Sequence, residues 1–174
     1  PGSTLSGKST IAAYLIKLGG KLITEDTAVI NINKKRATIL PSYPMIKISD
    51  KAKKYTRLSD KEGIFFKLEK NNRKGYRLNE SNFEKKEVDI DFCIFPVWAN
   101  KEMNKILKPS PKDLISLLLE SSLSIYPLNK EKEEYLFKQN FSFINKVRTF
   151  IYKRDKRFSN LEGLRENLIN MVDQ

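Results

Sequence analysis

Apolar side chains recur with a helical period over residues 11–18, and a pair of glycines follows them directly. This pattern predicts an amphipathic helix of about three turns that ends at the glycines, which favour the C-terminal cap. The run KLITEDTAVINI comes next and is rich in β-forming residues. It predicts a strand over residues 21–24 whose end carries two acids, Glu25 and Asp26.

Two polar breaks divide the following β-rich stretches into hairpins. The segments AVINI and RATIL flank residues 33–35, and GIFFKLEK and GYRLN flank residues 71–74. Each arrangement predicts strand, turn and strand. Between the hairpins, PSYP imposes an extended or turning backbone, because proline fixes its own φ and disfavours helix in the preceding residue. The stretch MIKISDKAKKY at residues 45–55 fits either a strand or the start of a helix.

The segment EVDIDFCIFPVWA at residues 87–99 changes from alternating to continuously apolar. This change predicts a strong strand with a central, buried end. We assign Trp98, Phe65 and Phe66 to the core as well. The linker KPSPKD then leads into a predicted helix, KDLISLLLESSLSIY, which Ser110 caps and which has a proline in its first turn.

The last third of the chain is more helical. Residues 130–147 continue the helical character, RTFIYKR predicts a terminal strand, and residues 159–172 predict an amphipathic helix capped by Ser159 or Asn160. Because hairpins follow the first helix instead of further βα crossovers, the predicted fold is α/β with a mixed sheet, hairpins and C-terminal helices.

The length of 174 residues and the hydrophobic content of 40% fit one ordinary domain with a real core. We therefore expect residues 1–174 to form a single domain. A nucleotide-binding βαβ unit has a strand before its first loop. We expect that strand to precede Pro1, outside this chain.

The net charge of +12, from 33 basic and 21 acidic residues, favours an anionic partner. The lysines are mixed with acids along the chain, so a solvated lysine-rich surface also explains the charge. No zinc-ligand spacing, RNP-like motif or concentrated basic helix indicates a nucleic acid. Lys74 and Arg77 could contact phosphate or an acidic substrate, although exposed hairpin charges are commoner.

Cys93 is the single cysteine and lies in an apolar stretch, which excludes a disulfide framework and predicts a buried, inert thiol. No apolar run approaches about 18 residues and no signal peptide begins the chain, so we expect a cytoplasmic protein without a membrane partner. Histidine is absent, which excludes Ser-His catalysis and histidine metal sites. A general base is then Asp or Glu, or less readily Lys or Tyr.

The opening residues PGSTLSGKST contain the spacing G-x-x-x-x-G-K-S. This is the Walker A pattern, in which backbone N–H groups of a glycine-rich loop surround phosphates and lead into a helix. The other interpretation is an accidental match in a flexible stretch. The pattern predicts a nucleotide as ligand, with Lys8 reaching its β- and γ-phosphates. The predicted nucleotide-binding residues are Gly2, Ser3, Thr4, Leu5, Ser6, Gly7, Lys8, Ser9 and Thr10.

Phosphoryl transfer needs Mg²⁺ at the terminal phosphates and a group that orients or deprotonates the nucleophile. Ser9 and Asp26 are the predicted metal ligands, and Glu25 is the candidate base for a hydroxyl nucleophile. The two acids could exchange roles, and each could instead be a solvated or turn-capping acid. Together with Lys8, these acids are the predicted catalytic residues.

The stretch GSTLSGKSTIAAYLIKLGGKLITEDTAVI, residues 2–30, resembles the nucleotide-binding core of the HPr kinase/phosphorylase family. In that family a G-x-x-x-x-G-K-[ST] loop, one helix, a basic-Gly-x turn and a strand ending in Asp-Asp follow one another at this spacing. Glu25 and Asp26 occupy the acid pair. The family includes kinases encoded with lasso-peptide biosynthesis and is distantly similar to ATP-dependent phosphoenolpyruvate carboxykinase. PSYPMIKI and KGYRLNESNF are further similar to the lasso-type subgroup.

The resemblance implies a P-loop core of the HPr kinase/phosphoenolpyruvate carboxykinase type, a serine kinase that uses Mg-ATP, and a homo-oligomer. The acceptor would be a serine of a peptide or small protein, such as a lasso precursor. The chain has Gly20 where bacterial HPr kinases usually carry histidine, and FIYKRDKRFSNL is a faint counterpart of the segment linked to phosphorylase activity. We therefore do not expect the reverse, phosphorylase reaction.

Two classes of function stay open. The first is an ATP-dependent serine kinase, and the second is a regulatory nucleotide-binding module with little transfer activity. The acids separate the two classes: a binding module needs Lys8 and tolerates the loss of Glu25, whereas a kinase needs both.

Overall fold

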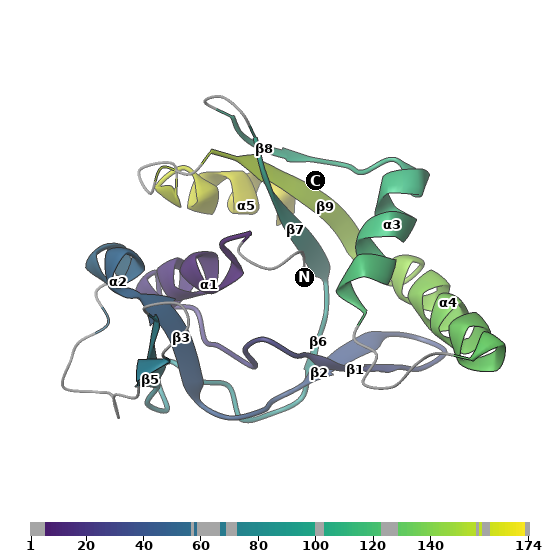
Figure 1. Cartoon of the computed structure of the whole chain (residues 1–174), viewed down its shortest axis with the longest axis horizontal. Coiled ribbons are helices and arrows are strands. Elements are labelled where there is room, and N and C mark those ends of the chain that lie inside the picture. The colour runs from purple at the N-terminus through teal and green to yellow at the C-terminus, as the bar shows by residue number, and fades with distance from the viewer. Residues whose placement is uncertain are drawn as a thin grey trace. The chain divides into compact units, whose positions relative to one another are not determined.

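The computed structural model shows a mixed α/β chain in which runs of consecutive strands are separated by helices (Figure 1). It describes residues 6–56, 58, 67–68, 73–99, 103–122, 129–155, 157 and 161–172. Within these residues no helix has both the length and the apolar character needed to cross a bilayer.

The described residues form two compact units. The unit that contains helix α1 (Lys8–Lys17), called the α1 unit, comprises the described parts of Gly7–Val29, Ile39–Glu87 and Arg157–Gln174. The unit that contains strand β9 (Arg148–Arg154), called the β9 unit, comprises Ser6 and the described parts of Ile30–Thr38 and Val88–Lys156. The expectation of a single domain stays a prediction.

Helix α1 confirms the helix predicted after the glycine-rich loop. Ala13 and Ile16 lie on its buried face, as the helical period of apolar residues requires. Gly19 follows with φ of 96°, a left-handed conformation that glycine adopts readily and that ends the helix. The predicted glycine stop is therefore confirmed.

A three-stranded antiparallel sheet of order β3-β5-β4 belongs to the α1 unit. Its strands and the helix after β3 are β3 (Met45–Ser49), α2 (Asp50–Thr56), β4 (Lys67–Leu68) and β5 (Arg73–Arg77). Ile46 and Ile48 are buried, and Lys47 points to the opposite face because successive side chains of a strand alternate. The stretch that fitted either a strand or a helix start therefore contains both.

One hydrophobic core lies within the α1 unit. Its buried members are Ala13, Ile16, Leu22, Ile46, Ile48, Ala52, Leu58, Tyr76, Leu78 and Phe83. Helix α5 (Leu164–Val172) belongs to the same unit and begins at Leu164, later than the sequence pattern predicted. The two proposed capping residues, Ser159 and Asn160, lie outside the described residues.

Two further three-stranded sheets have the orders β1-β2-β6 and β7-β9-β8. Their strands are β1 (Val29–Ile32), β2 (Ala37–Leu40), β6 (Val88–Asp89), β7 (Phe92–Trp98), β8 (Asn104–Leu107) and β9. Strand β9 pairs parallel with β7 and antiparallel with β8. The predicted mixed sheet and terminal strand are thus confirmed.

Asn33 forms the turn between β1 and β2. Its N–H donates to the Arg36 carbonyl at 3.1 Å, and its Oδ1 accepts the N–H groups of Lys35 and Arg36 at 2.9 and 3.0 Å. This local bonding is why asparagine favours turns, and it confirms the first predicted hairpin. The antiparallel β4–β5 pair confirms a second hairpin, but Arg73 and Lys74, which were assigned to its turn, lie in β5.

Helices α3 (Pro111–Ser121) and α4 (Lys130–Ile144) lie side by side in the β9 unit (Figure 1). The hydroxyl of Ser110 accepts the Asp113 N–H at 3.2 Å, which confirms Ser110 as the N-cap of α3. Asn129 caps α4 in the same way through the Lys132 N–H at 3.0 Å. Apolar side chains of both helices pack with Cys93 and Phe95 of β7.

Two strand predictions were wrong in extent. Residues 21–24 form no regular strand: only Leu22 makes a bridge, parallel to Phe83, through hydrogen bonds of 2.8 Å to Asn82 and Glu84. Residues 87–99 form two strands, β6 and β7, in different sheets. The N–H of Ile90 donates to the Ala37 carbonyl at 3.0 Å, so the pairing with β2 extends to Ile90 and stops before β7 begins. Within the described residues, β9 and not β7 is the central strand.

Cys93 is buried, as predicted, and burial raises the pKa of its thiol to about 11. Trp98 was wrongly assigned to the core: it is 37% exposed at the end of β7, with the guanidinium of Arg154 stacked 5.0 Å from its ring centre. An indole tolerates this position because its ring attracts a cation. Phe65 and Phe66 lie outside the described residues.

Candidate functional site

The N-terminus of α1 begins the candidate site. Gly7 precedes the helix with φ of 88°, a left-handed conformation that favours glycine because it lacks a Cβ. No side chain of the described residues caps this end of α1. The first N–H groups of a helix have no partner within the helix, and together with the helix dipole they favour an anion.

The structure describes part of the predicted phosphate loop. Ser6 is buried, and Gly7 to Thr10 lead into α1 in the predicted order. The other loop residues, Gly2, Ser3, Thr4 and Leu5, lie outside the described residues. Phosphate binding by the loop stays a prediction.

Lys8 is half-buried at the first position of α1, and this burial lowers the pKa of its ammonium. The negative charge of Asp26 raises that pKa, and the positive charge of Arg73 on β5 lowers it. Both charges therefore lie close enough to act on Lys8. Asp26 was predicted to share a site with Lys8, whereas Arg73 was not.

Glu25 is buried, with 9% of the residue exposed. Its Oε1 accepts the backbone N–H of Lys47 at 2.7 Å, while its buried Oε2 has no described partner within normal hydrogen-bond distance and angle. Burial raises the pKa of this carboxyl, although the Lys47 N–H and, more weakly, the Ser9 hydroxyl favour the charged form. A buried oxygen without a partner is costly, so Oε2 is suited to accept a proton or a hydroxyl group.

Asp26 has φ of 58°, the only positive φ of a non-glycine residue in the described part of the chain. The Thr27 N–H donates to the Glu25 carbonyl at 2.7 Å and closes a tight turn around Asp26. A positive φ is unfavourable for a residue with a Cβ, and such strain is common at functional sites. The turn leaves the Asp26 carboxylate half exposed, with Oδ2 lying 2.5 Å from Nζ of Lys47.

Lys47 is the residue that the sequence analysis missed. It lies on β3 between two buried isoleucines, and only 19% of its side chain is exposed. The hydrogen bond to Asp26 is the main cause that raises the pKa of its ammonium. Because residues 45–55 fitted either a strand or a helix start, nothing in the sequence indicated that Lys47 contacts both acids.

The arrangement fits a cation that is shared with phosphate. Mg²⁺ prefers oxygen ligands and is usually bound by one or two carboxylates, water and substrate phosphates. Among the described residues no three His, Cys, Asp or Glu side chains form a group able to hold a metal by themselves. Ser9 and Asp26 carry side-chain oxygens of this kind, and Oε2 of Glu25 has no partner among the described residues. These residues fit Mg²⁺ only when a further anionic ligand completes its shell.

Lys74 lies on β5 and pairs with Asp50 at 2.9 Å, so its ammonium is already partly neutralised. Arg77 is exposed at the end of the same strand. The ion pair of Lys74 with Asp50 does not involve Glu25 or Asp26. Their phosphate-binding interpretation stays a prediction.

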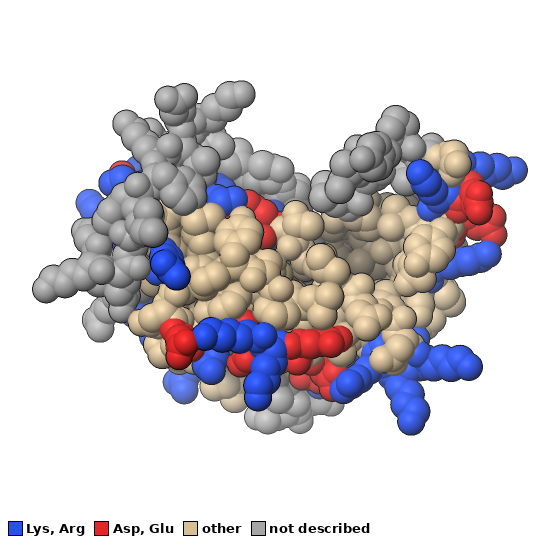
Figure 2. Space-filling model, turned by 90° about the horizontal axis from the view of Figure 1, so that it is seen from below, with Lys and Arg blue, Asp and Glu red and all other residues tan. Residues whose placement is uncertain are grey.

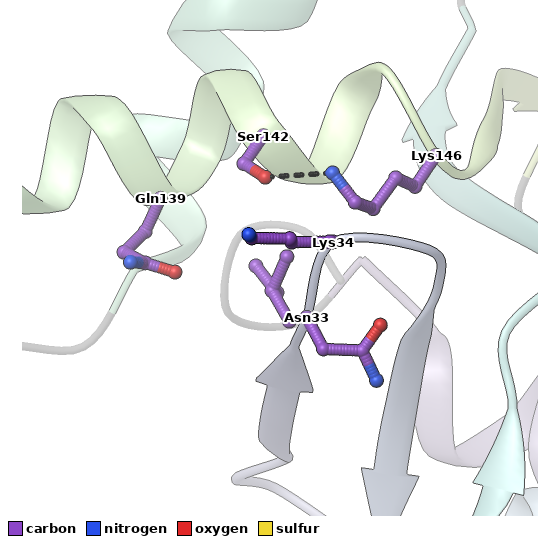
Figure 3. Close-up of a pocket in the computed structure, with 6 residues that line it drawn as sticks. Asn33, Lys34, Gln139, Ser142 and Lys146 are labelled. Atoms are coloured by element: carbon purple, nitrogen blue, oxygen red, sulfur yellow. Dashed lines mark hydrogen bonds between the residues drawn. The ribbon is translucent and has the colours of Figure 1, made fainter.

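The β9 unit contains a separate, open hollow (Figure 3). Lys34 points from the β1–β2 turn toward α4, where the ammonium of Lys146 donates to the Ser142 hydroxyl at 3.0 Å. The remaining lining residues are Ile32, Asn33 and Gln139. The described lining residues carry two ammonium groups and no carboxylate, so this hollow can attract an anion.

Acidic and basic side chains lie next to one another on the face shown in Figure 2. The described residues include exposed ion pairs, such as Lys74 with Asp50, and Arg36 with Asp89 at 2.9 Å. Exposed pairs of this kind contribute little to stability. They neutralise part of the positive charge locally, in keeping with a solvated lysine-rich surface.

Comparisons of the chain with protein-family models, with curated proteins and with solved structures found no match.

Proposed function

We propose that this chain is an ATP-dependent kinase of the HPr-kinase type, which transfers the γ-phosphoryl group of Mg-ATP to a serine hydroxyl. The observation that supports this proposal most directly is that Glu25 and Asp26 lie close to the start of α1. They follow Lys8 by 17 and 18 positions in the sequence. There Asp26 acts on the ammonium of Lys8, and the Ser9 hydroxyl acts on Glu25. The resemblance of residues 2–30 to HPr kinases supports the same assignment.

Nucleotide binding is the first step of the proposed reaction. The loop of residues 2–10 surrounds the phosphates, and Lys8 pairs with their β- and γ-oxygens. Ser9 and Asp26 hold Mg²⁺, which neutralises charge on the terminal phosphates. The uncapped N-terminus of α1 adds N–H groups and partial positive charge for the same anion.

Transfer then needs a proton acceptor for the serine hydroxyl. Oε2 of Glu25 takes the proton, the serine oxygen forms the new bond to the γ-phosphorus, and ADP leaves with the electrons of the broken P–O bond. Glu25 suits this role because burial raises the pKa of its carboxyl and Oε2 has no described partner. Asp26 suits the metal because it is the more exposed of the two acids.

The resemblance also supports the finer parts of the proposal. The acceptor is a serine of a peptide or small protein, with a lasso precursor as the specific candidate. The protein acts in the cytoplasm as a homo-oligomer, and neither a nucleic acid nor a membrane is its partner. Light scattering at micromolar concentrations tests the oligomer, and a monomer across that range contradicts it.

The alternative is a regulatory nucleotide-binding module with little transfer. The observation that favours it is the ion pair between Asp26 and Lys47, which occupies the carboxylate assigned to the metal. Both functions need Lys8, so nucleotide binding alone does not separate them. The rate of transfer, and its loss when Glu25 is changed, separates them.

The decisive experiment measures Mg-ATP binding by calorimetry in the wild type, Lys8→Ala and Lys17→Ala. Lys17 lies in the last turn of the same helix, so its variant loses an equal charge without touching the loop. We expect Lys8→Ala to abolish detectable binding and Lys17→Ala to retain it. Wild-type affinity in Lys8→Ala would show that the P-loop assignment is wrong.

A further inference from the structure

One lysine contacts both acids of the candidate site. The backbone N–H of Lys47 donates to Oε1 of Glu25 at 2.7 Å, and its ammonium lies 2.5 Å from Oδ2 of Asp26. The two contacts differ in kind. The first belongs to the backbone of β3 and does not depend on the side chain at position 47, provided the residue is not proline. The second depends on the lysine side chain.

The ammonium occupies the oxygen that a divalent cation would use. Two cations on one carboxylate oxygen repel each other strongly at short range. The Asp26 side chain is 52% exposed, so a cation from solvent can approach it. The long, flexible stem of lysine then allows the ammonium to move away without any change in β3.

We propose that Lys47 is a positioning residue that competes with a divalent cation for Asp26. In the cation-free state its ammonium holds the strained turn around Asp26 in place. When the cation binds, the ammonium leaves Oδ2 and pairs with a phosphate oxygen of ATP. ATP therefore strengthens cation binding, because it offers Lys47 a new partner, and the cation strengthens ATP binding to the same degree.

The identity of ATP in this inference rests on the proposed function. The competition itself does not, because it needs only Lys47, Asp26 and the cation. Binding of Mn²⁺ without nucleotide therefore tests the competition, and addition of ATP tests the coupling.

The experiment follows free Mn²⁺ by electron paramagnetic resonance in titrations of the full chain. It compares the wild type with Lys47→Met and with Lys105→Met, which removes an exposed lysine from β8 and gives the same net charge. We expect Lys47→Met to lower the Kd for Mn²⁺ by about two- to fivefold, within the range typical of a lost ion pair. We expect Lys105→Met to leave it close to the wild-type value.

A double variant shows whether Asp26 is the contested ligand. The gain from Lys47→Met should disappear in the Asp26→Asn background, because the two residues then no longer share an oxygen. Circular dichroism verifies folding, and Lys47→Gln replaces Lys47→Met if the latter does not fold. Equal Kd values in the Lys47 and Lys105 variants would overturn the competition.

The same Mn²⁺ titrations in the presence of ATP distinguish a failure of this inference from a failure of the proposed function. In the wild type ATP should tighten Mn²⁺ binding, and in Lys47→Met it should do so less. If ATP binds to both proteins and lowers the Kd for Mn²⁺ to the same extent, Lys47 does not exchange Asp26 for a phosphate oxygen. The nucleotide site is then still supported. If ATP binds to neither, the proposed function fails, and the nucleotide-free titration alone decides the competition.

Discussion

The hydroxyl of Ser42 donates to Oγ1 of Thr24 at 2.9 Å, and Thr24 in turn donates to the Thr27 carbonyl at 2.7 Å. The Ser42 N–H also donates to the Ile23 carbonyl at 3.0 Å. These bonds fix the loop on both sides of Glu25 and Asp26. The proline-flanked segment PSYP thus serves as the support of the acid-bearing turn.

Thr24→Val should therefore loosen the acid turn. The change removes a donor and an acceptor from a connected network, so we expect the free energy of unfolding to fall by about 1 kcal/mol. Urea denaturation measures this loss. Transfer from Mg-ATP should also fall, because Glu25 and Asp26 lose their fixed positions.

Thr149→Val is the matched control for this effect. It removes from the β9 unit a hydroxyl that donates to the Val147 carbonyl at 3.1 Å. Both variants should lose similar stability, but only Thr24→Val should lose transfer activity. An equal loss of activity in the two proteins would contradict a special role for the Thr24 network.

Glu25→Gln and Asp26→Asn should separate the two acids. Glu25→Gln keeps the shape of the side chain but cannot take a proton, so we expect ATP binding to persist and transfer to fall by about 10²- to 10⁴-fold. Asp26→Asn should in addition raise the Mg²⁺ concentration needed for half-maximal transfer. Single-turnover assays with labelled ATP and serine peptides at several Mg²⁺ concentrations measure both effects.

These assays show which of the two acids is the general base for transfer. Full activity in Glu25→Gln would move that role to Asp26 or to no residue at all. Full activity in both variants would rule out this acid pair as the catalytic centre of a kinase.

Cys93 should be unreactive in the folded protein. Burial raises the pKa of its thiol from 9.0 to about 11, so the nucleophilic thiolate is scarce at pH 8. We expect iodoacetamide to modify Cys93 slowly in buffer and rapidly in urea, as mass spectrometry would show. Rapid modification in buffer would show that β7 opens readily.

The same shift makes stability depend on pH in a definite direction. The folded state binds the thiol proton more tightly than the unfolded state, so this contribution is full below about pH 9 and is lost as the pH rises through about 11. The free energy of unfolding of the wild type should therefore fall more steeply over this interval than that of Cys93→Ala. Parallel curves for the two proteins would show that Cys93 is not shielded from solvent.

The sequence determined most local elements, because their signals are local. The helical period and the following glycine predicted α1, Asn33 predicted the first hairpin turn, and Ser110 with its proline predicted the start of α3. The same reasoning identified Lys8, Ser9 and the acid pair as one candidate site from their spacing alone. Each of these predictions depends on interactions within a few residues, or on a motif whose spacing is fixed.

Tertiary structure decided how strands pair and which residues face the acids. The single bridge at Leu22, the division of residues 87–99 between two sheets and the exposed edge position of Trp98 depend on partners distant in sequence. Lys47 lies 22 positions from Glu25, and the sequence pattern left open whether position 47 belongs to a strand or to a helix. Its two contacts arise because the turn at Asp26 brings one carboxylate to the backbone of β3 and the other to the side chain of Lys47. No local pattern of hydrophobic and polar residues encodes this long-range arrangement.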